Sequence, residues 1–80
     1  MSARIAHVEQ DSLAELAGLA ENDIILSINE IEIHDYLDYM YASCAESVNI
    51  TYKRSGKDYE VIIDNDDFEP LGITFDTLLI

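Results

Sequence analysis

The feature that most constrains the fold is a pair of alternating runs, SVNITYKR and KDYEVIID, on either side of Ser55-Gly56. In the first run Val48, Ile50 and Tyr52 alternate with polar residues, as in a strand with one buried face. Ser-Gly between two such runs is typical of a two-residue hairpin turn, because glycine accepts positive φ. In a chain of 80 residues, enough for one domain, this hairpin predicts a fold built on antiparallel strands.

A short first helix is predicted by the signals at its ends. Ser12 is a candidate N-cap, and Glu15 three residues later completes the pattern of a capping box. Gly18 is placed to end the helix, since glycine accepts the left-handed conformation that follows many helices. The helix is therefore little more than one turn long, with Leu13 and Leu16 on its apolar face.

A second helix is predicted over residues 36–44, with Asp35 as its N-cap. Four apolar residues follow the spacing i, i+3, i+4, i+7, namely Leu37, Met40, Tyr41 and Cys44. This spacing forms one helical stripe, which we expect to face the core. In this prediction Tyr41 and Cys44 are buried, and Tyr36 and Tyr39 are half exposed; in the alternative, the tyrosines line a groove.

Four further runs have the alternation and β-branched content of strands: residues 4–8, 23–29, 31–34 and 71–76. Together with the hairpin and the two helices, they predict an α+β domain. Its sheet is a small, mostly antiparallel β-barrel or sandwich of five to six strands with two helices. We expect one domain over residues 1–80.

The charge of the chain limits its partners. Its 17 acidic and 4 basic residues give a net charge of −13. Nucleic acids and anionic membrane surfaces are excluded as expected partners, because both need a basic face. No apolar run approaches a membrane span, and the single cysteine permits no internal disulfide, so we expect a cytoplasmic location.

No motif predicts a catalytic residue, a metal site or a cofactor in this chain. His7, His34 and Cys44 lack the close spacing of zinc ligands. The acidic run DNDDFE, residues 64–69, fails the calcium-loop pattern, because position six counted from Asp64 is Glu69 instead of glycine. We therefore expect no enzyme, and a solvated acidic loop.

The stretch EPLGITFD combines the only proline with one of three glycines just before the last predicted strand. Pro70 stiffens the entry to the turn, and Gly72 accepts backbone angles closed to other residues. Consecutive amides around such a glycine can form an anion-binding concavity. If the following strand is an edge, its free backbone groups can accept an added peptide strand.

The run VEQDSLAELAGLAENDIILSINEIEI resembles the PDZ-domain pattern, and the resemblance continues through the second helix and the hairpin. In PDZ domains a Gly-Leu-Gly-Phe-like loop holds the C-terminal carboxylate of a peptide. The resemblance gives this role to PLGI, residues 70–73, with the amides of Leu71, Gly72 and Ile73 as donors. That loop lies last in this chain, which implies the permuted strand order of bacterial PDZ domains.

The resemblance thus implies a non-catalytic module that binds a C-terminal or extended peptide by strand addition. The expected peptide-binding residues come from the last strand and the second helix: Leu71, Gly72, Ile73, Thr74, Phe75, Tyr36, Leu37, Met40 and Tyr41. The loop departs from the family in one respect, since acidic residues replace the usual nearby Arg or Lys. Like charges 4 Å apart in water repel by about 1 kcal/mol.

The phrases IHDYLDYMYASCAE and LGITFD are also similar to the PDZ-like N-terminal segment of a bacterial radical SAM family. This resemblance implies the alternative role, a structural docking domain excised from an iron–sulfur enzyme. Its partners would then be the remaining domains of that protein. The terminal TLLI, residues 77–80, resembles a PDZ ligand itself, and we expect it to enter the groove of a neighbouring molecule at high concentration.

Overall fold

The computed structural model describes residues 3–76, which form six strands and two helices. The strands are β1 (Ala3–Val8), β2 (Ile24–Ile28), β3 (Ile31–Glu32), β4 (Ser47–Arg54), β5 (Lys57–Asp64) and β6 (Ile73–Phe75). The helices are α1 (Leu13–Leu16) and α2 (Tyr36–Ala42). The small α+β fold predicted from the sequence is confirmed.

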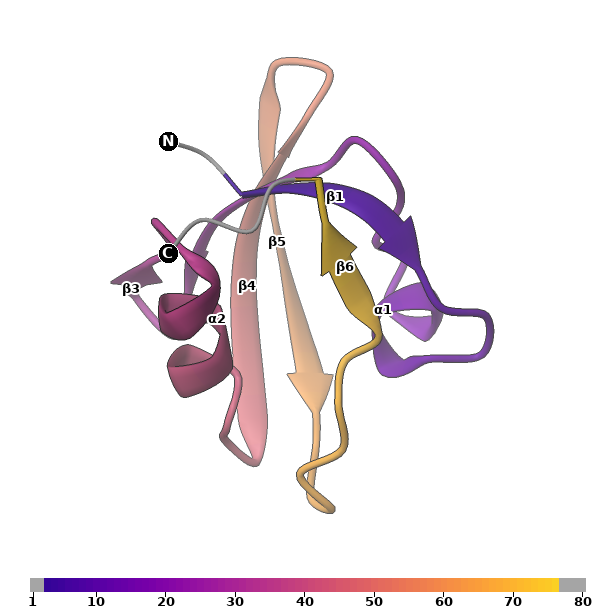
Figure 1. Ribbon diagram of the computed structural model, residues 1–80, viewed down its shortest axis with the longest axis vertical. Helices are drawn as coiled ribbons and strands as arrows, with labels where there is room; N and C mark the ends of the chain where they lie inside the picture. The colour runs from indigo at the N-terminus through magenta and orange to yellow at the C-terminus, as the bar shows by residue number, and fades with distance from the viewer. Residues whose placement is uncertain (1–2, 77–80) are drawn as a thin grey trace.

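The strands pair in the order β5-β4-β2-β1-β6, and β3 adds to β2 outside this path. Every pairing is antiparallel. The two helices lie on opposite sides of the molecule, with the long β4–β5 hairpin running between them (Figure 1). Because β6 ends the path, it pairs with β1 on one edge only, and no strand of residues 3–76 covers its other edge.

Two tight turns set the register of the sheet. Ser55 and Gly56 have φ of 52° and 79°, and Asn29 and Glu30 have φ of 50° and 69°. Positive φ at both central residues matches the right-handed twist of paired strands. The first turn was predicted in full. The strand after the second turn is shorter than predicted and ends at Glu32, although the Ile33 N–H still donates to the Leu26 carbonyl.

The predicted capping box of α1 is present, but the Glu15 side chain bonds to a different residue from the one expected. The Glu15 N–H donates to Ser12 Oγ at 3.2 Å. The Glu15 carboxylate, however, accepts from the N–H of Asp11 at 2.8 Å, one residue before the N-cap. Gly18 follows the helix with φ of 93°, as predicted. The turn is therefore fixed from both ends, although the helix has only four residues.

The core consists mainly of isoleucines from the sheet, and one buried carboxylate, Asp23, pairs with the partly exposed Arg54. Ile5, Ile25, Ile28 and Ile50 are at most 1% exposed. Asp23 is buried and accepts two hydrogen bonds from Arg54, at 2.7 and 2.6 Å. Arg54 also donates to the Gly18 carbonyl, so this pair joins the turn after α1 to the end of β4. Within the described residues no helix is long and apolar enough to cross a membrane.

Candidate functional site

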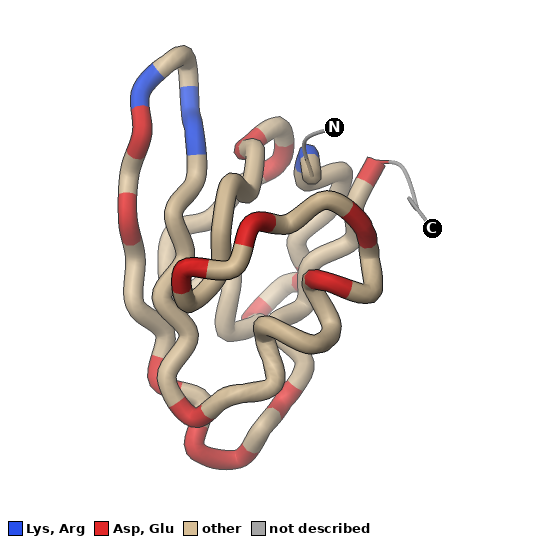
Figure 2. Tube along the Cα trace, turned by 90° about the vertical axis from the view of Figure 1, so that its left-hand side faces the viewer, with Lys and Arg blue, Asp and Glu red and all other residues tan. Residues whose placement is uncertain are grey.

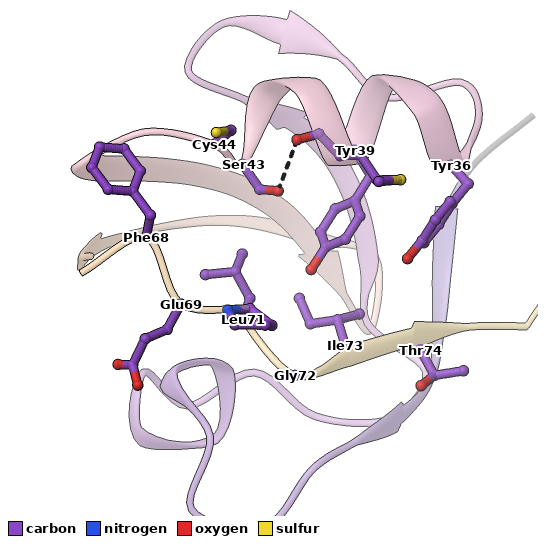
Figure 3. A pocket seen from close by; sticks show the side chains of 12 residues that line it. Tyr36, Tyr39, Ser43, Cys44, Phe68, Glu69, Leu71, Gly72, Ile73 and Thr74 are labelled. Atoms are coloured by element: carbon purple, nitrogen blue, oxygen red, sulfur yellow. Dashed lines mark hydrogen bonds between the residues drawn. The ribbon is translucent and has the colours of Figure 1, made fainter. Parts of the chain in front are cut away.

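A groove of about 380 Å³ lies between α2 and β6. Figure 3 shows helix side chains facing the side chains of β6 and of the segment before it across this groove. The helix side supplies Tyr36, Tyr39, Met40, Ser43 and Cys44. The opposite side consists of Phe68, Glu69, Pro70, Leu71, Gly72, Ile73 and Thr74. The groove thus has apolar walls and one open strand edge.

The backbone of β6 points the N–H and C=O groups of two residues into this groove. The carbonyl of Gly72 accepts from the Glu9 N–H, and the Asp76 N–H donates to the Arg4 carbonyl. Gly72 and Asp76 therefore face β1. Because the bonding direction alternates along a strand, the N–H and C=O groups of Ile73 and Phe75 face away from β1, toward α2. They are the groups that an added strand needs.

Gly72 is required by its surroundings. Its φ is 88°, and a Cβ there would overlap the Cβ of Ser12 and lie 2.7 Å from the Ser12 hydroxyl. The Ala14 N–H donates to the Leu71 carbonyl at 3.0 Å. The start of α1 therefore holds the turn before β6 against the body of the domain. This contact places the loop independently of any ligand.

Asn65, which the sequence analysis missed, fixes the loop before β6. It is 3% exposed, and its side-chain amide exchanges two hydrogen bonds with the backbone of Glu69, both 2.8 Å long. Its own N–H donates to the Glu46 carbonyl. The sequence signal was an asparagine inside an acidic loop, a residue that often bonds to nearby backbone in turns. Asn65 thereby sets the entrance of the groove.

Phe68 stands at that entrance with 54% of its surface exposed. Its φ of 53° is uncommon for an aromatic residue. An exposed aromatic side chain beside an apolar groove supplies contact area to a ligand. The sequence carried a signal here as well, since Phe68 is a lone aromatic residue among carboxylates.

The predicted inward face of α2 is wrong. Tyr39 and Ala42 face the core at 7% and 4% exposure, whereas Leu37 and Tyr41 are 63% and 78% exposed. Cys44, predicted to be buried, is exposed at the groove. Helix α2 carries two apolar stripes, and the small side chain of Ala42 lets the stripe that contains it approach the sheet. Hydrophobic spacing does not distinguish the two stripes.

The structure brings together six of the nine predicted peptide-binding residues: Tyr36, Met40, Leu71, Gly72, Ile73 and Thr74. Leu37 and Tyr41 lie outside the groove, on the outer face of α2, because of the reversed stripe. Phe75 lies in the core at 8% exposure, because the alternation along the strand turns its side chain inward. The backbone N–H and C=O groups of Phe75 still face the groove. The predicted ligand segment, residues 77–80, lies outside the described residues.

Tyr39 lies at the base of the groove. Its ring meets Phe75 edge to face, with 4.8 Å between ring centroids. Burial raises the pKa of Tyr39 to about 12, with a smaller contribution from neighbouring Tyr36. The phenol is therefore neutral across the physiological pH range, and the bottom of the groove carries no charge at Tyr39.

Three of the four basic residues pair with carboxylates. Arg4 pairs with Asp76, Lys53 with Asp58 and Arg54 with Asp23. Figure 2 shows the basic residues of the β4–β5 hairpin tip, with acidic residues beside them, at one end of the molecule and acidic residues without basic ones at the other. The acidic end comprises Glu46, Asp64, Asp66, Asp67 and Glu69. Among residues 3–76, none of those that line the groove is basic.

The two histidines contact carboxylates at separate places. His34 lies 3.1 Å from Glu32, and His7 lies 3.6 Å from Glu9. Within residues 3–76, no three side chains of metal-binding type gather to hold an ion.

A family model of the PDZ domain matches residues 4–54, more than half of the chain. The match runs from β1 to the end of β4 and so includes α2. The strand β6 and the loop before it lie beyond the matched residues, and their place in the groove comes from the structure. No curated protein matches the sequence.

Proposed function

The chain belongs to the PDZ domain family, and from this premise we propose that it binds an extended peptide along β6. PDZ domains are generally protein-interaction modules and typically non-catalytic. The peptide would lie antiparallel to β6 and exchange backbone hydrogen bonds with Ile73 and Phe75. An apolar side chain of the peptide would enter the groove between Met40 and Leu71.

The observation that carries this proposal is the pairing of an open strand edge with an apolar groove. An uncovered edge presents unpaired N–H and C=O groups, and strand addition satisfies them. Three exposed apolar side chains at the groove, Tyr36, Met40 and Phe68, would lose contact with water on binding. Burying apolar surface contributes about 25 cal/mol per Å² before the costs of ordering the peptide.

The test is an amide chemical-shift titration of the ¹⁵N-labelled chain with the acetylated, amidated peptide Lys-Val-Thr-Val-Lys. The expected shifts fall on residues 71–75 and on Tyr36, Met40 and Ser43. The hairpin turn at Ser55 and Gly56, far from the groove, is the internal control. Shifts confined to the outer face of α2, or no shifts at millimolar peptide, would contradict the proposal.

A second candidate is the docking domain of a larger protein, which the outer face of α2 favours. Ile31, Leu37 and Tyr41 are exposed there at 37%, 63% and 78%. A cluster of exposed apolar side chains is typical of a contact with another domain. That the larger protein is a radical SAM enzyme rests on the sequence resemblance alone. Its test is the reading frame after residue 80, where a Cys-x3-Cys-x2-Cys run is expected.

A further inference from the structure

We infer that the groove selects a basic peptide, with Lys or Arg beside the apolar anchor, and disfavours a free C-terminal carboxylate. This inference rests on the proposed function and names the ligand class of the same groove. Its basis is the charge around the two ends of β6, together with the apolar groove and the open edge.

The acidic end lies where the C-terminal part of the peptide would lie. A peptide antiparallel to β6 has its C-terminal side next to Gly72 and the loop of residues 64–70. Glu69 is among the residues that line the groove, with its carboxylate on the side of the loop away from α2 (Figure 3), and Asp66 and Asp67 belong to the same short loop. Asn65 binds the Glu46 carbonyl, so Glu46 joins this cluster from the sheet side.

The basic residues at the tip of the β4–β5 hairpin lie too far away to offset these carboxylates. Lys57 begins β5 and Asp64 ends it, eight residues along an extended strand. At about 3.3 Å per residue the two ends are roughly 23 Å apart. The Debye length at physiological salt is about 8 Å, so Lys57 is screened from the acidic end. Arg54 is occupied by Asp23 inside the fold.

At the other end of β6, the positive charge of Arg4 is paired with a carboxylate. Its guanidinium donates to Asp76, at 2.7 Å from Nε. The start of α2, next to the groove residue Tyr36, adds Asp35 and Asp38, whose carboxylates accept hydrogen bonds from the N–H groups of Asp38 and His34. A carboxylate at the end of a peptide would therefore find backbone N–H donors at Leu71, Gly72 and Ile73 but, among residues 3–76, no unpaired basic side chain near enough to offset the surrounding carboxylates, whereas a lysine would meet opposite charge.

The overall charge excludes a second copy as the favoured occupant. Each chain carries −13, so two copies repel before any groove contact forms. A basic peptide is attracted by the same field. Long-range attraction of this kind mainly raises the association rate, and it weakens with salt.

The experiment compares peptides that share the core Val-Thr-Val and differ at their flanks, measured by fluorescence anisotropy. Lys-flanked, Gln-flanked and Glu-flanked peptides are acetylated and amidated, and the Lys-flanked peptide is also made as a free acid. In 20 mM NaCl we expect the amidated Lys peptide to bind about tenfold tighter than the Gln peptide. The free acid should bind about threefold more weakly than the amide. Both differences should shrink in 500 mM NaCl.

Two variants that remove the same amount of charge at different places show which carboxylates cause the preference for the Lys peptide. Asp66→Asn/Asp67→Asn/Glu69→Gln should reduce the Lys-over-Gln preference severalfold. Glu21→Gln/Glu30→Gln/Glu60→Gln removes the same charge elsewhere and should keep most of that preference. An equal loss in both variants would overturn the assignment to the acidic end.

The remaining outcomes separate the two proposals. Equal binding of the Lys and Gln peptides, or tighter binding of the free acid, would overturn this inference and leave strand addition standing. Failure of every peptide to bind would overturn the proposed function and the inference together. Dimerisation of the chain that blocks peptide binding would make a second copy the occupant and would also overturn the inference.

Discussion

Gly72 shows how one residue serves both stability and the site. Its positive φ turns the chain into β6, and its missing Cβ leaves room for the cap of α1. The glycine was recognisable in the sequence because proline precedes it and a β-prone run follows. Its contact with Ser12 was not, since 60 residues separate them and no local pattern reports a tertiary approach.

We expect Gly72→Ala to destabilise the domain by about 2–5 kcal/mol. The left-handed conformation costs a side chain about 1–2 kcal/mol, and overpacking against Ser12 adds about 1–3 kcal/mol. Gly56→Ala is the matched control, because Gly56 has φ of 79° but open space around it. Urea unfolding of the two variants checks the difference. Equal destabilisation of the two variants would show that the close contact with Ser12 does not contribute to the loss of stability.

The raised pKa of Tyr39 leads us to expect a loss of stability at alkaline pH. Below pH 10 the phenol is neutral in both the folded and the unfolded state. Its pKa is raised to about 12 in the folded state, from 10.0 in the unfolded state, so between these values the unfolded chain releases the proton first. The free energy of unfolding should fall by about 1–3 kcal/mol over this window.

Urea unfolding between pH 9 and 12 measures this fall. Tyr39→Phe should remove most of it, and Tyr41→Phe, at an exposed position of the same helix, should not. The same slope in the Tyr39→Phe variant and the unsubstituted chain would place the cause elsewhere.

At the scale of elements, the sequence predicted which helices and strands form better than which faces meet. The hairpin around Ser55-Gly56 and the caps at Ser12 and Asp35 are local signals, and all three are present in the structure. The face of α2 depends on what the helix packs against. Both of its stripes are apolar, so only the tertiary fit of Ala42 and Tyr39 decides between them.

The reversed face of α2 gives a direct prediction for ligand binding. Met40→Gln replaces an apolar side chain at the groove by a neutral polar one and should weaken binding of the Lys-Val-Thr-Val-Lys peptide by about tenfold, because it removes an apolar contact that binding would bury. Leu37→Gln makes the same change on the outer face and should leave the affinity within about twofold. Isothermal titration measures both affinities. Stronger weakening by Leu37→Gln would show that the peptide binds the face of α2 that contains Leu37.

At the scale of the whole molecule, charge is the dominant property. With 17 acidic and 4 basic residues, the folded chain repels itself, and screening should favour the compact state. The sequence alone predicted the sign of this charge. Its separation into a basic hairpin tip and an acidic end required the structure, because it depends on β5 carrying the chain from one end to the other.

We expect the midpoint of thermal unfolding to rise by about 5 °C between 20 and 500 mM NaCl. This corresponds to about 1 kcal/mol for a domain of this size. Surface ion pairs such as Lys53–Asp58 lose strength with salt, but each contributes little. Asp66→Asn/Asp67→Asn/Glu69→Gln should gain less from salt than the unsubstituted chain. A midpoint that falls with salt would show that attractive pairs outweigh the repulsion.

The most direct test of the central claim is amide hydrogen exchange at β6, with and without the Lys-Val-Thr-Val-Lys peptide. In the free chain the Ile73 and Phe75 amides should exchange fast, because they face the groove, whereas the Thr74 amide faces β1 and should be protected. At saturating peptide, Ile73 and Phe75 should become protected while Ser55, in the hairpin turn, stays fast. Ile73 and Phe75 amides that remain unprotected in the bound state would contradict strand addition.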